Sequence, residues 1–264
     1  MLSALRQIKF PDSTNGLLVI LFFLSSHVYA FAPKRELYQL KIYHLKDNSQ
    51  KDRLEKYLKE AYLPALHRAG ISKVGVFKPV NEADSLLYVL IPFKSADQFM
   101  SLSEKLASDK TYLAAGDDYL NTSFDNPVFK GIESEFMEAI SGLPVMNLPK
   151  LKSAFNERIY ELRRYEAASE KLHENKIAQF NNGELDIFKK LGFNTVFSSQ
   201  VKVGKKLPAL VYMTSFENKE ERDAHWKAFG ADPDWKKLNA LPEYAHNFLR
   251  ADIYLLHPTA YSEI

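Results

Sequence analysis

A short segment in the second half of this sequence combines charged and phenolic side chains at alternate positions. Residues 159–165 read IYELRRY. In a β-strand, side chains point alternately to the two faces, so Glu161, Arg163 and Tyr165 share one face. On an enclosed face, a carboxylate, a guanidinium and a phenol can bind a small polar or anionic molecule. The alternative interpretation is a Glu–Arg pair that only fills a packed interior, because buried charges normally occur in pairs.

A related segment, LYQLKIY, lies 122 positions earlier, and there alternation groups Gln39, Lys41 and Tyr43. The other face carries Leu40 in the earlier segment and Tyr160, Leu162 and Arg164 in the later one. We expect the leucines of this face to pack against helices. The polar sets of both segments are then expected to point into one shared interior. These six side chains together form the candidate ligand-binding site.

Other kinds of catalytic or cofactor site are not indicated by the sequence. The chain contains no cysteine, which excludes disulfides, thiolate nucleophiles and Cys-ligated metal centres. Its seven histidines show no metal-binding spacing. It has no Gly-x-Ser-x-Gly motif and no glycine-rich phosphate loop. We therefore expect no metal and no bound cofactor.

The charges are dispersed along the chain. Its formal net charge is +2, and no block of five like charges occurs. Nucleic-acid-binding surfaces and polybasic membrane surfaces typically concentrate Lys and Arg. We therefore expect a small-molecule ligand as the partner and no nucleic acid. The sequence leaves open whether the chain forms a homo-oligomer.

The two segments belong to a longer internal repeat. An offset of 122 residues aligns Tyr38, Leu40, Tyr43 and Gly70 with Tyr160, Leu162, Tyr165 and Gly192. From the third strand of each half onward the offset is 123, and it aligns Phe93, Asp109 and Tyr112 with Phe216, Asp232 and Trp235. The chain therefore contains two copies of one structural unit.

Local patterns predict the elements of each copy. Apolar residues recur at three- and four-residue steps after each opening strand, as on one helix face. A break in the second of these helices is expected near 181–184, and Gly70 and Gly192 are expected to end the helices in the left-handed conformation. Asp232 is expected to cap a short helix that begins at Pro233. Further strands are expected at 72–77, 85–93, 128–139, 194–201, 209–216 and 247–256.

The order strand, helix, strand, strand, helix, strand is typical of the ferredoxin-like unit. In that unit both helices cover one face of the sheet, and the bare face needs a partner. The sequence therefore predicts an α+β fold in which two tandem ferredoxin-like halves close as an intramolecular dimeric α+β barrel. The predicted boundaries are 31–140 for the first half, 141–154 for a linker and 155–264 for the second half.

The N-terminus has the parts of a secretory signal peptide. Arg6 and Lys9 precede the apolar run GLLVILFFL at 16–24, which is shorter than the roughly 20 residues of a membrane-spanning helix. Small residues follow, and cleavage after Ala30 is expected. The sequence thus predicts a signal peptide over 1–30 and an exported protein, periplasmic or secreted, without stable membrane insertion after cleavage. An uncleaved anchor is the alternative.

The second half resembles the NIPSNAP family. The resemblance rests on PALVYMTSFENKEERDAHWKAFGADPDWKKL at 208–238, YELRRY at 160–165, GELDIFKKLGF at 183–193 and LLHPTAYS at 255–262. The first half keeps only the skeleton of this pattern and is similar to a diverged copy. The resemblance implies the dimeric α+β barrel superfamily but no settled reaction.

Two functions are compatible with the sequence. In the first, the barrel interior binds a small polar or anionic molecule, and an enzyme would then resemble the cofactor-free monooxygenases or isomerases of the superfamily. In the second, the barrel is packed solid and the protein is a non-catalytic interaction or adaptor protein. An empty interior of several hundred Å³ favours the first function. A filled interior favours the second.

Overall fold

The computed structural model describes residues 34–264 except 82 and 84. Residues 33–264 form one compact unit. The predicted signal peptide lies outside the described residues. Among the helices that the structure describes, none has the length and apolarity needed to cross a membrane.

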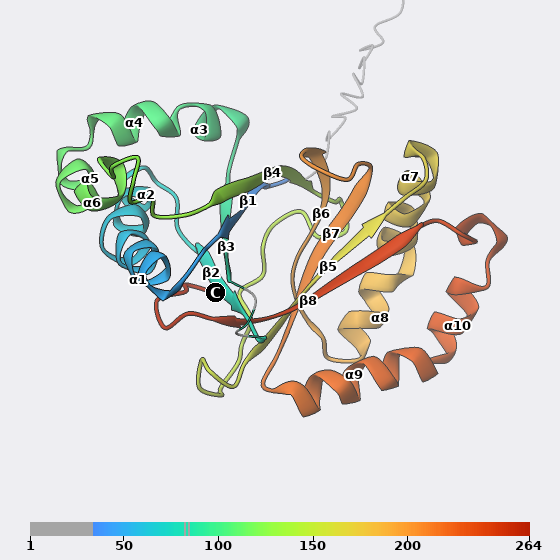
Figure 1. The fold of residues 1–264 in the computed structure, drawn as a ribbon. Coiled ribbons are helices and arrows are strands. Elements are labelled where there is room, and N and C mark those ends of the chain that lie inside the picture. Colours follow the sequence, from blue (N-terminus) through green and yellow to red (C-terminus); the bar gives the residue numbers. More distant parts are fainter. Residues whose placement is uncertain (1–33, 82, 84) are drawn as a thin grey trace, which may run out of the picture. The chain divides into compact units, whose positions relative to one another are not determined.

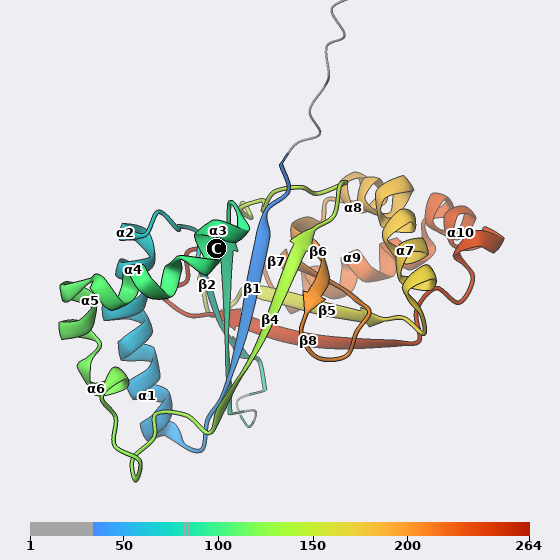
Figure 2. The same ribbon diagram turned by 90° about the horizontal axis from the view of Figure 1, so that it is seen from above.

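Eight antiparallel strands close into a barrel (Figures 1 and 2). Their order around the barrel is β1-β3-β2-β8-β5-β7-β6-β4. The strands are β1 (Leu37–His44), β2 (Gly75–Pro79), β3 (Leu86–Phe93), β4 (Gly131–Ala139), β5 (Ile159–Glu166), β6 (Asn194–Val203), β7 (Ala209–Phe216) and β8 (Arg250–Pro258).

Each half contributes four adjacent strands, β4-β1-β3-β2 from the first half and β8-β5-β7-β6 from the second. The corresponding strands of the two halves follow the same order. The pairs β2–β8 and β4–β6 join the halves, so neither sheet has a free edge. The predicted fold, two ferredoxin-like halves closed into one α+β barrel, is confirmed.

The helices cover the outside of the barrel in two groups, one for each half. Figure 1 shows α1 to α6 on one side of the strands and α7 to α10 on the other. The first group comprises α1 (Asn48–Tyr57), η1 (Leu58–Tyr62), α2 (Leu63–Arg68), α3 (Ala96–Met100), α4 (Leu102–Ser108), α5 (Lys110–Ala115) and α6 (Asp117–Leu120). The second comprises α7 (Glu170–Gln179), η2 (Phe180–Glu184), α8 (Leu185–Lys190), α9 (Lys219–Ala231), α10 (Pro233–Asn239) and η3 (Pro242–Tyr244).

The backbone repeats irregular features as well as regular ones. The π-helical segments η1 and η2 stand at equivalent positions, 122 residues apart. Gly70 and Gly192 end the preceding helices with φ angles of 82° and 78°, as predicted. The expected break near 181–184 is η2, where Gly183 leaves the helical conformation. Asp232 accepts hydrogen bonds from the backbone N–H groups of Asp234 and Trp235 at 2.9 and 3.1 Å, which confirms the predicted cap.

The buried apolar residues form three clusters. One fills the barrel interior and takes side chains from all eight strands. The other two lie outside the barrel, each between the sheet and the helices of its own half. Both faces of the central strands are therefore buried, and all eight residues of β7 are buried.

Candidate functional site

The structure places the predicted site residues of β5 outside the barrel, which corrects the expected orientation. Leu40 and Leu162, expected to pack against helices, belong to the cluster inside the barrel. Tyr165 packs instead in the sheet–helix layer, where its hydroxyl lies 2.9 Å from that of Tyr212. Alternation correctly grouped the side chains that share a face. It could not show which face lies inside the barrel, because a strand that is buried on both faces has no hydropathy difference between them.

Glu161 is fully buried under α9, where three donors surround its carboxylate. Arg163 Nε donates to one oxygen at 2.5 Å, while Arg222 Nε and Trp226 Nε1 donate to the other at 2.5 and 2.8 Å. The Arg163 guanidinium also stacks 3.5 Å from the centre of the Trp226 ring. A carboxylate with this many donors is satisfied by the protein itself. This geometry is that of a structural ion cluster rather than of a ligand site.

The three predicted residues of β1 also face helices, on the opposite side of the barrel. Gln39 Nε2 donates to Ser134 Oγ at 2.8 Å. Lys41 Nζ lies 5.1 and 5.2 Å from the ring centres of Tyr43 and Tyr62, and burial lowers the pKa of this lysine to about 8. Strands β1 and β5 are four places apart in the barrel order, so the six predicted residues are not brought together.

A different set of residues forms a cavity of about 340 Å³ at one end of the barrel. Its wall is made by inward-facing residues of both halves and by the loop between β6 and β7. The lining residues are Leu40, Ile42, His44, Leu86, Tyr88, Glu133, Glu135, Leu162, Arg164, Lys205, Lys206, Val211 and Tyr254.

The most unusual feature of this cavity is a buried ion pair between Arg164 and Glu135. Both residues are less than a tenth exposed. They come from β5 and β4, which are not neighbours in the barrel, so the pair crosses the interior. Burial raises the pKa of the Glu135 carboxyl, and the adjacent guanidinium opposes that change. Buried charges with perturbed pKa values cluster at functional sites, which makes this pair the centre of the candidate site.

Aromatic and charged groups complete the mouth of the cavity. The rings of Tyr88 and Tyr254 lie 6.2 Å apart, and burial raises the pKa of Tyr254. His44 and Lys205 both approach Glu133, at 3.2 and 2.9 Å. Lys206 is paired with Asp252, also at 2.9 Å. The mouth therefore combines an apolar wall with several positive groups.

The other part of the barrel interior is filled. Ring centres of Tyr38 and Phe197 lie 5.2 Å apart, and those of Phe77 and Tyr160 lie 4.9 Å apart. The interior is thus neither an open channel nor a solid core. Sequence reasoning missed Arg164 and Glu135, although the alternation in IYELRRY had already placed Arg164 on the face of Leu162.

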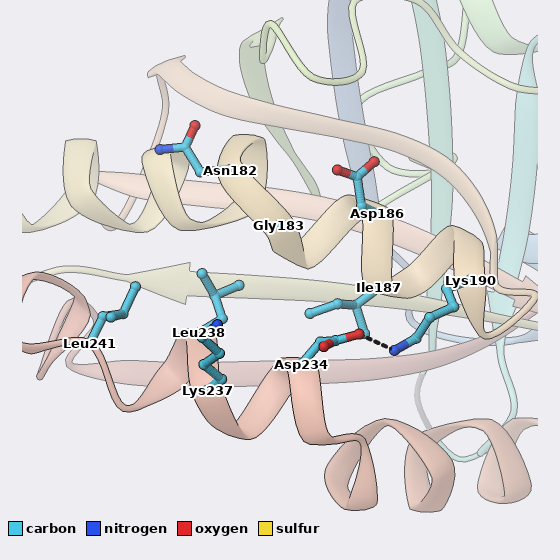
Figure 3. A pocket seen from close by; sticks show the side chains of 9 residues that line it. All are labelled: Asn182, Gly183, Asp186, Ile187, Lys190, Asp234, Lys237, Leu238 and Leu241. Atoms are coloured by element: carbon cyan, nitrogen blue, oxygen red, sulfur yellow. Dashed lines mark hydrogen bonds and ion pairs between the residues drawn. The ribbon is translucent and has the colours of Figure 1, made fainter.

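A second hollow lies on the outside of the second half, between α8 and α10 (Figure 3). Its volume is about 350 Å³. Figure 3 shows Ile187 and Leu238 on the two helices that border it, and Lys190 in contact with Asp234. The Lys190 ammonium lies 2.6 Å from carboxylates of both Asp232 and Asp234, so it links the two helices. This groove lacks the buried charges of the barrel cavity.

Comparison with known proteins agrees with this architecture. Residues 160–263 match the NIPSNAP family. A monooxygenase-like protein of Lactobacillus acidophilus aligns over 85% of this chain and 94% of its own, with 10% identity and a TM-score of 0.58. A monooxygenase-like protein of Fusobacterium nucleatum aligns over 86% and 93%, with 6% identity and a TM-score of 0.56. At these identities the similarity shows the fold alone.

Single NIPSNAP domains align with less than half of the chain. A NIPSNAP-like domain protein from Burkholderia xenovorans covers 40% of this chain and 89% of its own, with 18% identity and a TM-score of 0.37. No curated protein matches the sequence.

Proposed function

We propose that this chain, whose second half is a NIPSNAP domain, binds a small organic molecule in the mouth of its α+β barrel. The observation that carries the proposal is the cavity of about 340 Å³ around the buried Arg164–Glu135 pair. This volume is within the range of small-molecule sites, roughly 300–1,000 Å³. A solidly packed adaptor would not need such a cavity.

The lining defines the chemical class of the ligand. Leu40, Ile42, Leu162 and Val211 offer an apolar surface for a planar or hydrocarbon body. The guanidinium of Arg164 donates through Nη1 to the carbonyl oxygens of Lys205 and Lys206 and through Nη2 to Glu135. Its Nε–H and second Nη2–H are the donors left for a carboxylate, a sulfonate or a similar polar group. The ligand is therefore a small amphipathic anion, with its charged end at the ion pair and its body along the barrel wall.

Glu135 is the buried carboxyl group of this cavity, and a carboxyl group can transfer a proton. Burial raises the pKa of its carboxyl, which brings the acid and its conjugate base closer in free energy at neutral pH. An enzymatic form of the proposal therefore assigns proton abstraction or return to Glu135 and anion binding to Arg164.

The test is a fluorescence titration with 8-anilinonaphthalene-1-sulfonate, which combines aromatic rings with one anionic group. We expect saturable binding at one site. Ile42→Trp should fill the mouth and weaken binding on the order of tenfold or more, because the dye and the indole need the same space. The control is Ile253→Trp, which places the same side chain on β8 beside Tyr254 but facing away from the cavity.

Arg164→Gln separates anion binding from apolar contact in the same assay. We expect weaker dye binding by this variant, while Ile253→Trp binds like the unmodified protein. Equal dye binding by the unmodified protein, Ile42→Trp and Arg164→Gln would refute the proposal and favour the adaptor function.

Export is a separate proposal and rests on the pattern of residues 16–30. Cleavage after Ala30 gives a mature protein that begins at Phe31. N-terminal sequencing of protein recovered from the periplasm or medium of its host tests this proposal. A chain that begins at Met1 would contradict it.

A further inference from the structure

A third hollow, larger than the barrel cavity, lies where the end of the chain crosses to the first half. Figure 1 shows the segment after β8 beside α1 and β2. The backbone N–H of Thr259 donates to Val76 O at 2.9 Å, and that of Glu263 donates to Val74 O at 3.0 Å. The groove has a volume of about 670 Å³. Its lining residues are Glu55, Lys56, Lys59, Lys78, Phe155, Asn156, His257, Pro258, Thr259, Ala260 and Tyr261.

Lys78 and His257 face this groove side by side. They are directly opposite each other in the β2–β8 pair, with side chains on the face outside the barrel. The Nδ1 atom of His257 lies 2.8 Å from the carbonyl oxygen of Arg158, so this nitrogen is the donor and Nε2 remains for a ligand. Among the described residues, no carboxylate is paired with either side chain. Two groups that can carry positive charge are unfavourable neighbours across a sheet unless an anion lies between them.

Further lysines add to the positive charge. Lys56 and Lys59 are three positions apart at the junction of α1 and η1, which places both on the groove side. Neither forms an ion pair within the described part of the chain. Glu55 is the single carboxylate of the lining, against three lysines. The lining of the groove therefore carries more positive than negative charge.

The remaining lining provides apolar surface. Phe155 is 38% exposed and is held by the guanidinium of Arg158, 4.5 Å from its ring centre. Pro258 and Ala260 line the same hollow. The groove therefore offers an apolar surface beside its lysines.

We propose that this groove binds a phosphorylated small molecule with a planar body, such as a nucleoside diphosphate. Lysines contact phosphate groups as point charges, and several of them around one groove suit a ligand with more than one phosphate. The phosphates lie between Lys78, His257 and the two helix lysines. The planar body packs on Phe155. This site is separate from the barrel cavity, and its occupant differs in charge and size.

The test is isothermal titration with ADP, inorganic pyrophosphate and adenosine. We expect ADP to bind most tightly, pyrophosphate more weakly, and adenosine not measurably. The double variant Lys56→Met/Lys59→Met and the single variant Lys78→Met should each weaken ADP binding on the order of tenfold, because each removes charged donors.

The matched control is Lys227→Met/Lys236→Met, which removes two exposed lysines of α9 and α10 and leaves the groove intact. This control should bind ADP like the unmodified protein. The groove variants should still bind 8-anilinonaphthalene-1-sulfonate, so failure of one site is distinguishable from failure of the other.

Two results would overturn the inference. The first is no saturable binding of ADP or pyrophosphate at millimolar concentration. The second is an equal loss of affinity in the groove variants and in the matched control, which would show attraction by net charge alone.

Discussion

The sheet–helix layer of the second half combines aromatic rings with buried ion clusters, whereas the same layer of the first half has aromatic rings and no buried ion pair among the described residues. In the second half, Lys176 Nζ lies 2.9 Å from Glu184 and 2.8 Å from Gln179, and all three residues are buried. At the equivalent positions, 122 residues earlier, the first half has Leu54 and Tyr62 in place of the lysine and the glutamate.

The first half fills the corresponding space with a cluster of tyrosines. The rings of Tyr57 and Tyr119 stack 3.6 Å apart, and the hydroxyls of Tyr57 and Tyr112 are 2.8 Å apart. Tyr43 and Lys41 border this cluster. Lys41 has no carboxylate partner among the described residues, although its counterpart Arg163 is part of the Glu161 cluster.

The two halves therefore share a backbone without sharing all of their side-chain chemistry. Both halves keep the strand order, the π-helical segment and the left-handed glycine. Both also pack aromatic rings between sheet and helices, but only the second half adds buried ion pairs there, within the described residues. A sheet–helix interface needs filled volume and satisfied polar groups, and rings alone or rings together with ion clusters can meet that need.

The largest expected difference between the halves is at Glu161 and Gln39. Glu161→Ala should lower the free energy of unfolding by about 3–5 kcal/mol, because two partly buried guanidinium groups lose their shared carboxylate. Gln39→Ala should cost about 1 kcal/mol or less, the usual contribution of one neutral hydrogen bond. Urea denaturation of both variants measures the difference, and equal losses would refute the contrast.

Lys41 and Arg163 should respond to the same substitution with opposite signs. Lys41→Met is expected to stabilise the protein at pH 7 by about 1–3 kcal/mol, because burial without a carboxylate lowers the pKa of this lysine to about 8. Arg163→Met is expected to destabilise it, because Glu161 loses a donor. Denaturation at pH 7 tests both, and destabilisation by Lys41→Met would contradict the prediction.

Lys41 should also make the stability of the protein depend on pH in the alkaline range. Between about pH 8 and 10 the unfolded chain keeps the Lys41 proton that the folded chain has lost, so the unfolded state binds more protons. Stability should therefore rise with pH across this window. Comparison with Lys41→Met isolates this contribution, and a variant with the same slope as the unmodified protein would exclude Lys41 as its source.

The smallest expected effect is at His173, which should make the stability of the protein depend on pH below pH 7. Burial, together with nearby Lys202, lowers the pKa of this imidazole in the folded protein. The unfolded chain then binds more protons below about pH 6.5, so stability falls as pH decreases from 7 to 5.5. His173→Gln should reduce this fall. The counterpart in the first half, Lys51, should show no such effect when changed to Gln.

The sequence alone determined the repeat and the elements of each half. Local chemistry was sufficient for that purpose: Gly70 and Gly192 favour left-handed helix ends, and Asp232 caps a helix that begins with proline. The alternation of side chains along a strand also correctly placed Leu162 and Arg164 on one face of β5 and Glu161 and Arg163 on the other. These features depend on neighbours in the chain, which a sequence shows directly.

Only the tertiary structure decided which face of each strand lies inside the barrel. Glu161 faces helices because Arg222 and Trp226, some 60 residues later, supply its donors there. Arg164 faces inward and meets Glu135 across the barrel, from a strand of the other half. A strand buried on both faces carries no hydropathy signal for inside and outside. The partners that fix its orientation are distant in sequence, so closure of the barrel determined the site.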